Sequence, residues 1–121
     1  MKEILLIYNF GEEEKRKLAR ALMPLKFRIR EAAREDYGRP VGVLAGVLED
    51  PGSPAEEAEM EAPMMVMAGL TGQRLDELLK GLRKAGLRIP YKAVLTDTNQ
   101  SWKAADLLKE LMREHELMTK R

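Results

Sequence analysis

The sequence has no cysteine among its 121 residues. This excludes disulfides, thiolate catalysis and sulfur-ligated metals, and it fits a reducing compartment such as the cytoplasm. His115 is the only histidine, and the positions three and four residues away from it carry neither histidine nor carboxylate. A transition metal prefers nitrogen or sulfur ligands. We therefore expect no metal site and no cofactor.

Long apolar runs are also missing. None approaches the roughly 20 residues that span a bilayer, and the first residues lack the apolar segment and cleavage site of a signal peptide. We expect a soluble, cytoplasmic protein with no membrane partner.

Aromatic residues make up only 5% of the chain, so a base-stacking platform has little support. The net charge of +1 provides no general attraction to nucleic acid or anionic lipid. Nucleic-acid binding is therefore not expected. It would depend on six basic residues: Arg28, Arg30, Arg83, Lys84, Arg88 and Lys92.

Charged residues, in contrast, are abundant and unevenly distributed. Residues 1–30 carry eight basic and four acidic side chains, residues 31–63 two basic and nine acidic, and residues 64–121 eleven basic and seven acidic. Much of the acid lies in residues 49–63, which also contain three prolines. We predict a flexible acidic loop there, and a protease should cut it first.

Two apolar runs, at residues 3–8 and 64–68, predict strands buried on both faces. An amphipathic helix follows each of them, at 12–23 and 73–85, and a further strand follows each helix, at 26–30 and 91–95. Leucines recur at the same offset in both halves, which indicates an internal strand–helix–strand repeat. A last helix is expected over residues 101–118.

These elements predict a single α/β domain over residues 1–121. The favoured fold is a four-stranded, mainly parallel sheet of order 2-1-3-4 with helices on both faces. A ferredoxin-like sandwich is the alternative, since it also places the two apolar strands in the centre. A short helix at 40–48, which Gly42 and Gly46 would let approach the sheet, and the lack of alternation in the apolar strands favour the parallel sheet.

The stretch Lys92-Ala93-Val94-Leu95-Thr96-x-Thr98-Asn99-x-x-Trp102 resembles the signature of a small bacterial family, domain of unknown function 3783. The resemblance covers residues 62–118 well and the upstream half more loosely. It implies a core of strand, helix, strand and closing helix. The family has no assigned activity, so the resemblance implies none here.

In a parallel doubly wound sheet, ligands bind beyond the carboxyl ends of the strands, where the strand order reverses. Polar side chains and helix starts at that edge predict a site for a small anion. The candidate ligand-binding residues are Asn9, Thr71, Lys92, Thr96, Thr98, Asn99, Ser101 and Trp102.

Each candidate also has a purely structural interpretation. Asn99 and Ser101 could cap the last helix, and Trp102 could fill the core instead of offering a stacking face. Lys92 could be a buried functional cation or an edge lysine that deters strand pairing.

No nucleophile and base occur in a recognisable arrangement, so we identify no catalytic residue and favour a non-enzymatic protein. The first hypothesis is a small binding or regulatory module for an unknown anion or partner protein. The alternative is an assembly module that forms a homodimer through strand 26–30, strand 91–96 or the last helix.

Overall fold

The computed structural model describes residues 2–119. The first half contains β1 (Ile4–Tyr8), α1 (Glu12–Leu22) and β2 (Ile29–Glu31), and the second half contains β3 (Met64–Ala68), α3 (Gly72–Lys84) and β4 (Lys92–Val94). A one-turn helix, α2 (Val41–Leu44), lies between the halves, and α4 (Ala104–Thr119) follows β4. Short 3-10 turns occupy Met23–Leu25, Arg34–Asp36 and Asn99–Ser101.

The four strands form one sheet in the order β2-β1-β3-β4, which confirms the predicted order and the α/β class. Both outer pairs, β1 with β2 and β3 with β4, are parallel. The central pair is antiparallel, with Ile4 opposite Ala68 and Tyr8 opposite Met64. The sheet is therefore mostly parallel, and its one reversal lies in the middle.

The path of residues 32–63 explains the reversal. This segment leaves β2 beside the end of β1, where the Ala32 N–H donates to the Ile7 carbonyl at 2.9 Å. It returns to the same end of β1, because Met64, the first residue of β3, pairs with Tyr8, the last residue of β1. A parallel connection would have to cross the whole length of the sheet, usually through a helix. The one-turn α2 does not make that crossing.

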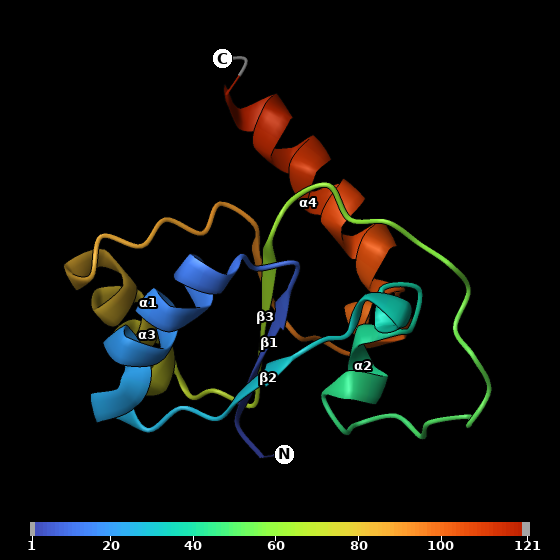
Figure 1. Cartoon of the computed structure of the whole chain (residues 1–121), viewed down its shortest axis with the longest axis horizontal. Coiled ribbons are helices and arrows are strands. Elements are labelled where there is room, and N and C mark those ends of the chain that lie inside the picture. Colours follow the sequence, from blue (N-terminus) through green and yellow to red (C-terminus); the bar gives the residue numbers. More distant parts are fainter. Residues whose placement is uncertain (1, 120–121) are drawn as a thin grey trace.

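Helices cover both faces of the sheet (Figure 1), so a ferredoxin-like sandwich with helices on one face does not describe this fold. On one face, α1 and α3 pack side by side, and Leu18, Leu22, Leu78 and Leu82 bury against β1 and β3. On the other face, α2 and the first half of α4 cover the alternate residues of the same strands. The second half of α4 projects beyond the sheet.

Three predicted boundaries change for local reasons. Lys26 adopts a left-handed conformation with φ of 56°, so β2 begins only at Ile29. The predicted helix 40–48 shortens to α2, and Gly42 approaches the Gln100 carbonyl instead of the sheet. The last helix begins at Ala104 because Trp102 is extended, with ψ of 140°.

Residues 49–63, the acidic segment, contain neither helix nor strand and run over the outside of the α2–α4 face (Figure 1). Several contacts attach the segment to the domain. Met60 is buried, its carbonyl accepts the Asn9 Nδ2–H at 2.9 Å, and Glu56 pairs with Lys103. The flexibility expected of this segment remains a prediction.

Among the helices of residues 2–119, none combines the length and the apolar character needed to cross a membrane.

Candidate functional site

The antiparallel central pair separates candidates that a fully parallel sheet would have brought together. Asn9 follows β1 and Thr71 follows β3. Because these two strands are antiparallel, the two residues lie at opposite ends of the strands. Asn9, with φ of 61°, donates its side-chain N–H to the acidic segment. Thr71 lies at the same end of the sheet as the residues that follow β4, because β3 and β4 are parallel.

Thr96 and Asn99 bond mainly to each other. The Asn99 Oδ1 accepts the Thr96 N–H at 2.8 Å, and the Thr96 Oγ1 accepts the Asn99 N–H at 3.1 Å. The Asn99 Nδ2–H donates to the Val94 carbonyl at 3.0 Å. This reciprocal arrangement resembles a capping box. Both polar atoms of the Asn99 side chain are engaged in the turn after β4, so Asn99 has a structural contact there but does not cap the last helix, which begins at Ala104.

The other candidates of this edge do not form a common pocket. The Thr71 Oγ1 caps α3 by accepting the Arg74 N–H at 3.2 Å. Thr98 and Ser101 are exposed. The Trp102 side chain is 37% exposed and does not fill the core. The Trp102 backbone carbonyl accepts the Val41 N–H at 3.0 Å.

Asn99→Ala should therefore reduce stability rather than remove a ligand contact. Two side-chain hydrogen bonds are lost, each worth about 1 kcal/mol, so we expect the free energy of unfolding to fall by about 1–2 kcal/mol in urea denaturation. Ser101→Ala, at an exposed neighbour, should change it by less than about 0.5 kcal/mol. Equal, small effects of both substitutions would contradict a structural role for Asn99.

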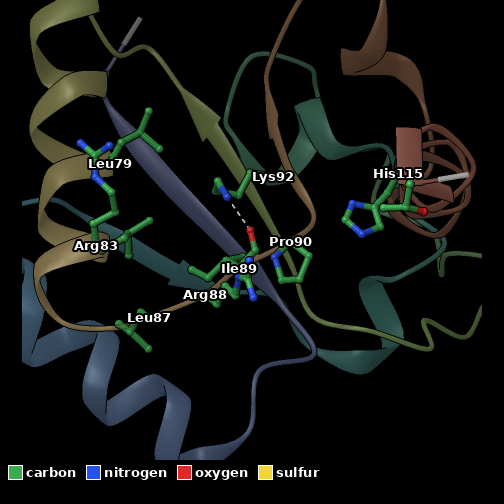
Figure 2. Close-up of a pocket in the computed structure, with 10 residues that line it drawn as sticks. Leu79, Arg83, Leu87, Arg88, Ile89, Pro90, Lys92 and His115 are labelled. Carbon is green, nitrogen blue, oxygen red and sulfur yellow. Dashed lines mark hydrogen bonds between the residues drawn. The ribbon is translucent and has the colours of Figure 1, made fainter. Parts of the chain in front are cut away.

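Lys92 lies apart from this turn, in a groove of about 620 Å³ beside the outer strand β4 (Figure 2). Helix α3, the loop before β4, β4 itself and the projecting end of α4 surround the groove. Its lining residues are Leu79, Leu82, Arg83, Leu87, Arg88, Ile89, Pro90, Lys92, His115 and Thr119. In Figure 2, Leu79 and Arg83 stand on α3 at one side, and His115 lies on α4 at the other.

The charge of the groove is one-sided. Arg83, Arg88 and Lys92 line it together with His115, and no carboxylate of residues 2–119 does. Within residues 2–119, no ion pair involves any of these four side chains. The Lys92 ammonium donates to the Ile89 carbonyl (Figure 2), and its desolvation lowers the pKa of Lys92 below the ordinary value.

Sequence reasoning missed this groove as a site. Arg83 and Arg88 were considered only within a scattered basic set, and Lys92, although a candidate ligand-binding residue, was placed with the polar residues at the carboxyl ends of the strands. His115 contacts the Tyr91 ring edge-on, with 5.6 Å between ring centroids. Among residues 2–119, no group of three or more histidine, cysteine or acidic side chains could hold a metal ion.

The protein is a small α/β module. Its two strand–helix–strand units meet at an antiparallel central pair, and a closing helix and a basic groove complete it. Residues 63–118, from β3 into α4, match the family described as Domain of unknown function (DUF3783). No curated protein and no solved structure matches the chain. All groove residues except Thr119 fall within the matched part, whereas Asn9 lies outside it.

Proposed function

We propose that this protein is a small, non-enzymatic binding module that recognises an anionic ligand in the groove beside β4. The observation that supports this proposal most directly is the position of Lys92. Its ammonium group is partly desolvated and has a backbone carbonyl, not a carboxylate, as its hydrogen-bond partner. A desolvated charge without a counter-ion is unfavourable, so an anion in the groove would be stabilised by pairing with it.

The surroundings of Lys92 fit the same ligand class. Arg83 and Arg88 can reach the groove from α3 and from the following loop, and guanidinium groups bind carboxylates and phosphates with two hydrogen bonds. The volume of about 620 Å³ falls within the range of small-molecule sites, roughly 300–1,000 Å³.

The proposal keeps the small anion expected from the sequence but moves its position. Of the residues predicted at the site, only Lys92 lines the groove. The Thr96–Asn99 turn contributes indirectly, because the Asn99 side chain bonds to the end of β4. The site therefore lies at the outer edge of the sheet instead of at the carboxyl ends of its central strands.

Calorimetric titration with inorganic pyrophosphate tests the proposal. The matched control is Lys109→Met, which removes the same charge from an exposed position of α4 outside the groove. Wild type and Lys109→Met should bind pyrophosphate alike, and Lys92→Met should bind at least about tenfold more weakly. Equal affinities for all three proteins would contradict the proposal.

A second candidate function, homodimer assembly, is favoured by the projecting end of α4. Leu117 is 55% exposed and Met118 72% exposed, well beyond Leu108, the last buried residue of that helix. The nearby Arg113 and Glu110 already pair with each other within α4, so the exposed apolar side chains are what a second copy would contact.

Light scattering coupled to gel filtration tests this second candidate. Assembly through α4 predicts a dimer for wild type and a monomer for Met118→Glu. A wild-type monomer at high concentration would exclude it.

A further inference from the structure

The groove has a second property besides its charge, and the inference drawn from it rests on the proposed function. We propose that the ligand is an amphipathic anion, in which a carboxylate or phosphate head is joined to an aliphatic chain. The head pairs with the basic cluster around Lys92, and the chain lies along the apolar part of the groove.

Apolar side chains form half of the lining. Leu82 and Ile89 are each 4% exposed and form a buried base, while Leu79 and Leu87 are only half-buried. Pro90 is exposed beside them. In Figure 2, Leu79 lies next to Arg83 on α3, and Leu87 stands at the opposite end of the loop from Lys92. The apolar surface and the basic groups therefore occupy one groove.

This combination distinguishes an amphipathic anion from an inorganic one. An inorganic anion would pair with Lys92 but leave Leu79 and Leu87 in contact with water. An aliphatic chain would cover them, and each methylene removed from water increases affinity by up to about fourfold. The energetic gain therefore grows with chain length until the apolar surface is covered.

Two other occupants are disfavoured, one by charge and one by the geometry of β4. A second copy placed with its groove against this one would bring Arg83, Arg88 and Lys92 near their own counterparts, and like charges repel. Strand addition to β4 is limited because β4 has only three residues and the Asn99 side chain occupies the Val94 carbonyl. Short strands and lysines are common devices that prevent edge pairing.

The test compares octanoate, acetate and octanol by calorimetric titration of the whole chain, with octanoate kept below its micelle concentration. Octanoate carries both parts of the ligand, acetate only the head and octanol only the chain. We expect octanoate to bind at least about tenfold more tightly than either. Octyl phosphate, compared with octanoate, shows which head the basic cluster prefers.

Substitutions test which residues bind the charged head of the ligand and which bind its aliphatic chain. Lys92→Met should reduce octanoate affinity to that of octanol, and Leu79→Ser should reduce octanoate affinity without changing acetate affinity. Leu117→Ser is the control, since this exposed leucine lies outside the groove and its substitution should change neither. Thermal unfolding confirms that each variant is folded.

The outcomes separate the inference from the proposed function. If acetate and pyrophosphate bind at Lys92 and octanoate binds no more tightly than acetate, the amphipathic ligand is wrong and the anion-binding module stands. If octanol binds as tightly as octanoate to wild type, the head contributes nothing to binding and the amphipathic ligand is wrong, while the anion-binding module stands or falls with pyrophosphate. If none of the anions binds, both also fall.

Discussion

Gly38→Ala should lower the free energy of unfolding by about 2–3 kcal/mol, the upper part of the range of roughly 1–3 kcal/mol typical of an overpacked site. Gly38 is buried, and a β-carbon built there would lie 2.0 Å from the Glu56 carbonyl oxygen. The obstacle is backbone, so no side chain can rotate away. Relief requires the acidic segment to move off the domain, which would weaken the burial of Met60 and the pair between Glu56 and Lys103.

Urea denaturation and limited proteolysis check this expectation together. The matched control is Gly72→Ala, because a β-carbon at the start of α3 meets no atom within 4 Å. The control should be neutral or slightly stabilising. Cleavage within residues 49–63 should be faster for Gly38→Ala than for wild type. Unchanged stability and unchanged cleavage would show that the acidic segment does not pack against Gly38.

Lys92→Met should change ligand affinity and stability in opposite directions. Affinity for an anion should fall at least about tenfold, because a charge-assisted hydrogen bond is lost. The free energy of unfolding should rise slightly, by about a few tenths of a kcal/mol, since a partly desolvated ammonium without a counter-ion is removed and solvent screening keeps the effect small. A residue that served only stability would lose stability when replaced, so the opposite signs identify a functional cation.

The pH dependence supplies an independent check. Burial lowers the pKa of Lys92 in the folded protein below 10.5, its ordinary value, so the unfolded chain binds more protons between the two values. Wild-type stability should therefore increase with pH in the window that extends up to about 10.5, relative to Lys92→Met. Below that window, the difference between the two proteins should be constant. Parallel stability profiles throughout would contradict a desolvated Lys92.

The internal repeat was readable in the sequence, and the backbone shows why. Asn9 and Gly69 occupy equivalent positions after β1 and β3, and both have positive φ, at 61° and 74°. Asparagine and glycine are the residues that most readily adopt this conformation. Each turn then leads into an amphipathic helix with its two buried leucines at matching positions.

The direction of the central pair could not be read in the same way. An apolar run such as 64–68 indicates a buried strand but carries no information about parallel or antiparallel pairing. The direction depends on where residues 32–63 return to the sheet, and that is determined by dispersed contacts such as Asn9 with Met60. The expected meeting of Asn9 and Thr71 depended on this direction.

The groove was hidden from sequence reasoning for a different reason. Leu79 fits the periodic face of α3 as well as Leu78 and Leu82 do, yet only the latter two are buried. Leu79 instead lines the groove, and His115 of α4 lines its other side. Lys92, in contrast, was recognisable as a cation within an apolar strand.

Amide chemical-shift mapping with octanoate locates the site directly. We expect the largest shifts at Lys92, Leu87 and Arg83, extending to His115 on α4, and we expect them to disappear in Lys92→Met. Shifts concentrated on Thr96–Trp102, or on Asn9 and Thr71, would place the ligand elsewhere and contradict the groove as the functional site.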